Sequence, residues 1–102
     1  MQPGCTLIGV IYGKPEHRAT LTAILAAQVE PTRRESGCLE YQFHVSQDDP
    51  DKFMFYENWT SPAALDEHLQ QPHLQPLFSR KDELMARDVE LIRLTMLSEY
   101  AR

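Results

Sequence analysis

Apolar and polar residues alternate through residues 38–45, which is the pattern of a β-strand with one face turned toward a core. A polar turn at 46–51 separates this run from a second β-rich run at 52–59, so the two are predicted to pair as a hairpin. Further β-rich runs at 5–12 and 88–97 predict a first and a last strand.

Helical periodicity occupies the intervals between these runs. A helix opening at 14–16 would place five residues on one face: Leu21, Ile24, Leu25, Gln28 and Val29. Pro31 is predicted to kink or end it, with a last turn reaching residue 34, and Gly37 is a natural stop. Ser61 and Pro62 predict the start of a second helix running to about residue 70, and a further helical stretch follows at 73–87.

The predicted order is β-α-β-β-α-β, with the second helix divided at Pro72. This is the split βαβ order of the ferredoxin-like fold, an α+β architecture in which helices cover one face of a four-stranded antiparallel sheet. A chain of 102 residues has the length of one domain, here 1–102, with a core over about 5–97 and a tail at 98–102.

The first and last predicted strands carry apolar residues on both faces. The residues concerned are Leu7, Ile8, Val10, Ile11, Leu91, Ile92, Leu94, Met96 and Leu97. Because helices can cover only one face, the second face needs another cover, and a second copy of the same sheet is the simplest one. The pattern predicts a homodimer in which two sheets pack face to face.

Charge and hydropathy narrow the choice of partners. The net charge is −5 at pH 7, and the basic pair Arg33-Arg34 is followed by Glu35 and is interpreted as a solvated helix end. Since phosphate contacts require clustered Lys and Arg, neither a nucleic acid nor an anionic membrane is an expected partner. No signal segment and no apolar stretch of about 20 residues is found, so a cytoplasmic protein is expected.

Two cysteines, Cys5 and Cys38, are too few for a disulfide framework. Both fall in predicted strands, where a small free thiol packs well, and Cys38 is expected on the face opposite Leu39 and Tyr41. No nearby cation is evident that would lower the pKa of either thiol, so the sequence assigns neither a role.

The strand at 52–59 ends in the only tryptophan of the chain, and the helix after it carries a histidine. The side chains on the tryptophan's face of this strand are Phe53, Phe55, Glu57 and Trp59. His68 lies at helical spacing from Leu65 and Leu69 and therefore points toward the sheet. An aromatic wall opposite one titratable group is a pattern typical of a small apolar pocket.

These residues fit either a catalytic or a structural role. A free imidazole titrates near pH ~6.5, so His68 could act as a general base or acid, although a core histidine bound to a backbone carbonyl fits the same position. Trp59 could hold a planar aromatic substrate or simply fill the core. We predict His68 and Trp59 as catalytic residues, and as substrate contacts Phe53, Phe55, Glu57, Leu65 and His73. A carboxylate such as Glu57 is costly in apolar company unless it is paired or protonated.

A metal site is the alternative use of the same groups. Glu57, His68 and His73 would supply two imidazoles and a carboxylate. The two histidines are five residues apart with Pro72 between them, so they do not share one helical face, and we predict no metal and no cofactor. The chain has no Gly-rich phosphate loop, no Gly-x-Ser-x-Gly elbow and no Cys-x-x-Cys pair.

Four segments together resemble a known family. They are Glu30-Pro31-Thr32-Arg33, Glu35-x-Gly37-Cys38-Leu39-x-Tyr41, Phe55-Tyr56-Glu57-x-Trp59 and Ala64-Leu65-x-x-His68-x-x-x-x-His73. The chain resembles the antibiotic biosynthesis monooxygenase (ABM) domain, and among its members the quinol monooxygenases, over nearly its whole length. The resemblance implies a ferredoxin-like fold and a dimeric α+β barrel, and it assigns Trp59 and His68 to the family's pocket.

The resemblance also implies an activity. Relatives include cofactor-free monooxygenases of anthrones or quinols, haem-degrading oxygenases and enzymes that process a signalling molecule. Haem-degrading members have an asparagine on the first strand, where this chain has Leu7-Ile8-Gly9-Val10. Anthrone oxygenases have an asparagine shortly before the tryptophan, in the region that Phe53 and Phe55 occupy in this chain. We therefore expect a quinol-like or phenolic substrate that reacts with O2. The alternatives are a non-catalytic dimeric ligand-binding module and, behind it, haem binding.

Overall fold

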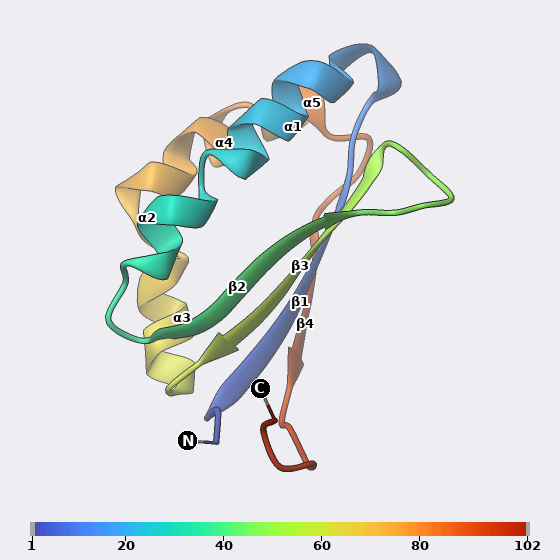
Figure 1. The fold of residues 1–102 in the computed structure, drawn as a ribbon. Coiled ribbons are helices and arrows are strands. Elements are labelled where there is room, and N and C mark those ends of the chain that lie inside the picture. Colours follow the sequence, from blue (N-terminus) through green and yellow to red (C-terminus); the bar gives the residue numbers. More distant parts are fainter. Residues whose placement is uncertain (1, 102) are drawn as a thin grey trace.

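The computed structural model describes residues 2–101. Its four strands form one antiparallel sheet in the order β2-β3-β1-β4, and the helices cover one face of this sheet (Figure 1). The strands are β1 (Cys5–Tyr12), β2 (Cys38–Val45), β3 (Lys52–Trp59) and β4 (Glu90–Leu94). The predicted ferredoxin-like α+β fold is confirmed.

The helical layer consists of short pieces. They are a 3₁₀ turn (Pro15–His17), α1 (Arg18–Ala26), α2 (Val29–Arg33), α3 (Pro62–His68), a second 3₁₀ turn (Pro72–Leu74), α4 (Gln75–Ser79) and α5 (Lys81–Leu84). Ser61 caps α3 as predicted, since its Oγ accepts from the Ala64 amide at 3.1 Å. The stretch predicted at 73–87 is divided, and Met85 is already extended.

The first helix is interrupted earlier than Pro31. α1 ends at Ala26, and Pro31 lies inside the separate turn α2, so the predicted last turn exists. A proline lacks an N–H and its ring collides with the carbonyl four residues before it, which here belongs to Ala27. The helix therefore breaks before Val29 and resumes with Pro31 in the first turn of α2.

Two strand details differ from prediction. The last strand covers Glu90–Leu94 and not the whole of 88–97. Cys38 pairs with Trp59 and packs against the core, on the same face as Tyr41, whereas alternation had placed it on the opposite face. A β-bulge between Cys38 and Glu40 adds one residue and reverses the alternation before it.

The core lies between the helices and the sheet. Its largest fully buried side chains include Trp59, Phe53, Leu7, Leu25 and Leu65. Each strand residue of this group belongs to the helix-facing side, as the register of β1 against β3 requires.

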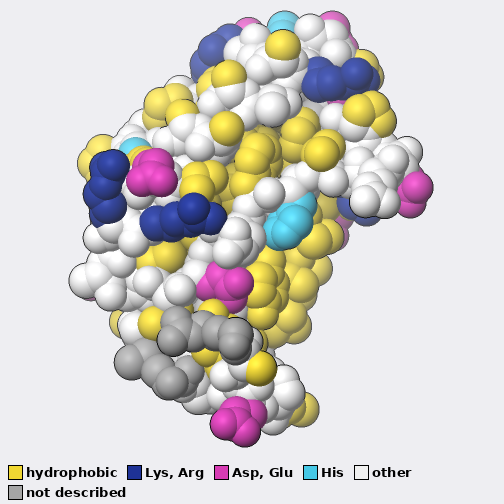
Figure 2. Space-filling view, in the orientation of Figure 1, with side chains coloured by type: hydrophobic (Ala, Val, Ile, Leu, Met, Phe, Trp, Pro, Cys, Tyr) yellow, Lys and Arg dark blue, Asp and Glu magenta, His cyan; other side chains and the backbone are white. Residues whose placement is uncertain are grey.

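The opposite face of the sheet carries no helix among residues 2–101 (Figure 1). Met54, Ile92 and Leu94 lie on this face and are 37%, 41% and 42% exposed. Figure 2 shows hydrophobic side chains gathered over the strands beside the helical layer. In the part of the chain described here, no helix has the length and apolar character needed to cross a membrane.

Candidate functional site

A cavity of about 360 Å³ lies between the sheet and the helical segments α3 to α5. Its apolar wall includes Leu7, Ile11 and Phe55 from the sheet and Leu74, Leu77 and Met85 from the helical layer. Gln28, Glu57 and His68 contribute polar groups. A volume in this range, mainly apolar and with a few convergent polar groups, fits a small organic ligand.

His68 comes from the last turn of α3 and is 2% exposed. Its Nδ1 lies 2.7 Å from Oε2 of Glu35, and Nε2 of His73 lies 3.0 Å from the same oxygen. Burial lowers the pKa of His68, while the hydrogen bond and charge of Glu35 oppose that shift. An imidazole whose pKa is lowered by burial favours its neutral form, which can accept a proton.

A second ionisable group of the cavity is Glu57, which lies on the inner face of β3 and is 4% exposed. The Trp59 indole N–H donates to its carboxylate at 3.0 Å. Burial raises the pKa of Glu57 to about 7, the Trp59 hydrogen bond lowers it and the charge of Glu35 raises it. This carboxyl group is therefore poised to exchange protons near neutral pH.

The structure brings some of the predicted site residues together and separates others. Phe55, Glu57 and His68 line the cavity. Trp59 is fully buried and is not among the residues that line the cavity, and its ring centroid lies 4.6 Å from that of His68. At this position Trp59 contacts the His68 ring, and its indole N–H donates to Glu57.

Three predicted substrate contacts lie away from this cavity. Phe53 is four residues before Glu57 on an extended strand, about 13 Å along it, and stacks on Phe43 in the core. Leu65 is fully buried in the core. His73 borders a separate surface hollow, and it contacts Glu35 and the His68 ring, whose centroid lies 6.0 Å from its own. None of the three is among the residues that line the cavity.

Two residues of the site were not predicted from the sequence. Glu35 was assigned to a solvated helix end, but its side chain is 14% exposed and holds both histidines. Its presence in the family-like segment before Gly37 was the available signal. Gln28 lines the cavity, and its Nε2 is buried with no hydrogen-bond partner among the described residues. A polar residue on the apolar face of the predicted helix was the signal there.

The candidate metal-binding residues differ from the predicted set. Glu35, His68 and His73, and not Glu57, offer ligand atoms within 4.8 Å of one another. Two imidazoles and a carboxylate can hold a divalent transition metal. Here one nitrogen of each imidazole lies at hydrogen-bond distance from the same oxygen of Glu35, so the three groups form a hydrogen-bonded cluster.

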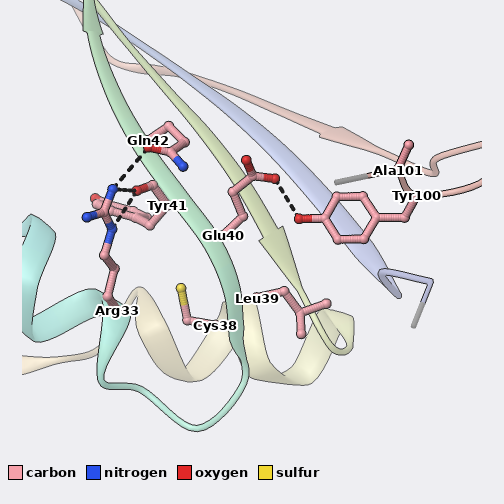
Figure 3. A pocket seen from close by; sticks show the side chains of 8 residues that line it. All are labelled: Arg33, Cys38, Leu39, Glu40, Tyr41, Gln42, Tyr100 and Ala101. Atoms are coloured by element: carbon pink, nitrogen blue, oxygen red, sulfur yellow. Dashed lines mark hydrogen bonds between the residues drawn. The ribbon is translucent and has the colours of Figure 1, made fainter.

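The segment carrying Glu35 is held in place from both sides. The Arg33 guanidinium donates to the Tyr41 carbonyl at 3.1 and 2.9 Å and ties the end of α2 to the edge strand β2, as Figure 3 shows. Gly37 leaves room for α3, because a Cβ there would collide with the Ala64 Cβ. No glycine of the described residues has a positive φ, so Gly37 is needed for space and not as a helix stop.

A second hollow of about 440 Å³ is lined by Arg33 and residues of β2. Figure 3 shows its lining side chains, among which the Tyr100 hydroxyl donates to Glu40 at 2.7 Å. Cys38 borders this hollow, and burial raises the pKa of its thiol to about 11. Burial also raises the pKa of Cys5. Both thiols are therefore protonated at neutral pH and suit packing roles.

The fold and site together define a small α+β protein with an apolar pocket under its helical layer. The family model described as Antibiotic biosynthesis monooxygenase matches residues 5–78. The chain therefore belongs to the antibiotic biosynthesis monooxygenase family.

The chain is also similar to individual proteins along most of its length. Rv0793 of Mycobacterium tuberculosis is 37% identical over 86 residues, covering 84% of each chain. Its structure has a TM-score of 0.88, with 95% of this chain and 98% of that chain covered. PA3566 of Pseudomonas aeruginosa is 36% identical with a TM-score of 0.85, covering 96% and 97%. The uncharacterised protein sll1783 of Synechocystis is 32% identical over 81% of this chain, which spans 56% of its length.

Proposed function

We propose that this protein is a cofactor-independent monooxygenase that oxidises a quinol-like or phenolic aromatic substrate with O2. The observation that carries the proposal is the position of His68. It lines the apolar cavity while its Nδ1 is engaged by Glu35, so Nε2 is the ring nitrogen free to take a proton from a bound hydroxyl.

Proton removal is the step that the site serves. A phenolate is far richer in electrons than the phenol and reduces O2 directly. One oxygen atom then remains on a ring carbon as a carbonyl, and the other leaves as water with the hydrogens that the ring carbon and hydroxyl lose. The apolar wall favours this reaction because it excludes bulk water from the reacting atoms.

Two further groups support a substrate that carries ring oxygens. The Gln28 Nε2 is buried with no hydrogen-bond partner among residues 2–101 and can donate to an oxygen acceptor in the cavity. Glu57, with a pKa of about 7, can donate to or accept from a second hydroxyl or carbonyl near neutral pH. A ring with oxygens at separate positions would satisfy both groups.

The test is oxygen consumption by chelator-treated protein with a panel of hydroquinones, naphthols and naphthoquinols. Uptake is expected to exceed the autoxidation rate measured without protein, and product formed under ¹⁸O2 is expected to carry one labelled oxygen. Uptake at the autoxidation rate across the panel, with ligand binding retained, would instead favour the non-catalytic binding module.

We also expect the exposed sheet face to bind a second copy of this chain. Replacing Ile92 and Leu94 with glutamate places charges on that face and is expected to convert a dimer into a monomer, measured by light scattering after size exclusion. Val45→Glu is the matched control, since Val45 is 53% exposed but belongs to the helix-facing side of the hairpin. A wild-type monomer at micromolar concentration would contradict this expectation.

A further inference from the structure

The Glu35 carboxylate shares one oxygen between two imidazoles. Oε2 lies 2.7 Å from Nδ1 of His68 and 3.0 Å from Nε2 of His73. An ionised carboxylate only accepts hydrogen bonds, so each of these nitrogens must carry its hydrogen. The geometry therefore selects the Nδ1–H tautomer of His68 and the Nε2–H tautomer of His73.

The surroundings of the other nitrogen of each ring fit a neutral imidazole. Nδ1 of His73 is buried and has no partner among the described residues, and a bare lone pair there costs less than an orphaned N–H of a charged ring. Burial lowers the pKa of His68 and likewise favours its neutral form. With Nδ1 of His68 carrying hydrogen, the lone pair of the ring is on Nε2.

Glu35 is not among the residues that line the ligand cavity. It borders a separate hollow of about 420 Å³ with Trp59 and Glu67, while His68 lines the ligand cavity. Its backbone is fixed by hydrogen bonds from its own amide to Thr32 and from the Cys38 amide to its carbonyl, each 3.0 Å long. A carboxylate held in this way orients the ring as well as its hydrogens.

We propose that Glu35 is a positioning residue that keeps His68 in the Nδ1–H tautomer and so presents the Nε2 lone pair to a ligand hydroxyl. In the proton transfer, the O–H bond of the ligand breaks and an Nε2–H bond forms. The Nδ1 hydrogen stays on His68, and Glu35 stabilises the resulting imidazolium without becoming protonated. Only the identity of the ligand rests on the proposed function.

The direct test is the ring ¹⁵N spectrum of the full chain, labelled with ¹⁵N-histidine, with His68 assigned through a His68→Phe spectrum. Wild-type protein near pH 7 is expected to show a protonated Nδ1 and an unprotonated Nε2 on His68. In Glu35→Ala the preference for Nδ1–H is expected to be lost. Glu35→Gln is expected to change the tautomer as well, since its amide can donate to Nδ1.

The matched control is Glu67→Gln, because Glu67 is an exposed carboxylate bordering the same hollow as Glu35. It is expected to leave the His68 spectrum unchanged. Glu35→Gln keeps the size of the side chain and is the variant to use if Glu35→Ala does not fold. An Nε2–H tautomer in wild type, or an unchanged tautomer in the folded Glu35 variants, would overturn the proposal.

Kinetics separates this inference from the proposed function. Glu35→Gln is expected to lower kcat of quinol-dependent oxygen uptake about 100-fold, with KM changed much less. If wild type consumes no oxygen but shows the expected spectra, the monooxygenase proposal fails and the role of Glu35 stands. Wild-type uptake with an unchanged kcat in Glu35→Gln would overturn the role of Glu35 alone.

Discussion

Replacing His68 with phenylalanine is expected to lower the rate of quinol-dependent oxygen uptake by about 100-fold or more. The phenyl ring keeps an aromatic group against Trp59, whose ring lies 4.6 Å from that of His68, but supplies no proton acceptor. Substrate would then have to ionise without a base in a cavity that disfavours charge. Initial rates in an oxygen electrode, corrected for autoxidation, give the measurement.

His44→Phe is the control for this substitution. His44 is exposed, its ring contacts the Met54 carbonyl, and it does not line the cavity. Its replacement is expected to leave the rate unchanged. Thermal unfolding of both variants establishes that each is folded at the assay temperature. A folded His68→Phe variant with the wild-type rate would show that His68 is not the base.

Replacing Glu57 with glutamine is expected to stabilise the protein at alkaline pH and to have little effect in acid. Burial raises the pKa of Glu57 from 4.5 to about 7 in the folded protein. Below pH 4.5 the group is protonated in both states, so folding is not penalised. Between these values the unfolded chain ionises first, and stability therefore falls as the pH rises toward 7.

A pKa difference of this size corresponds to roughly 3 kcal/mol, which is fully lost above pH ~7. Glutamine does not ionise and can still accept from the Trp59 indole. Urea denaturation at pH 4 and pH 8 is expected to give similar stabilities in acid and a variant that is more stable by up to about 3 kcal/mol at pH 8. His68 titrates in both proteins, so the comparison removes its contribution.

Glu67→Gln provides the control, because Glu67 is exposed and its replacement is expected to leave the pH dependence of stability unchanged. Equal stabilities of wild type and Glu57→Gln at both pH values would mean that Glu57 is not held in a desolvated site. Its assignment to the polar wall of the cavity would then be wrong.

Local pattern determined most of the fold. Strict alternation located the β2–β3 hairpin to the residue, and Ser61 with Pro62 located the start of α3. These signals are local because strand and helix periods are set by the backbone. The boundaries that failed depend on contacts between elements, such as the β-bulge at Cys38 and the short last strand, which alternation alone does not report.

Local sequence patterns also predicted part of the candidate site. The order of aromatic residues on β3 and the spacing of Leu65 and His68 place an imidazole under the helices near Trp59. Sequence spacing does not say which of several buried aromatic rings reaches a cavity. Phe53 and Trp59 share a face with Phe55, yet only Phe55 of the three lines the cavity.

By itself, the sequence determined the order of the elements, their apolar faces and the residue types available for chemistry. Only the tertiary structure decided that Glu35, 33 residues before His68, holds its Nδ1, and that Glu57 is paired with Trp59. The physical reason is that hydrogen bonds and desolvation act over a few ångströms in space. They are therefore fixed by how helices pack on the sheet and not by distance along the chain.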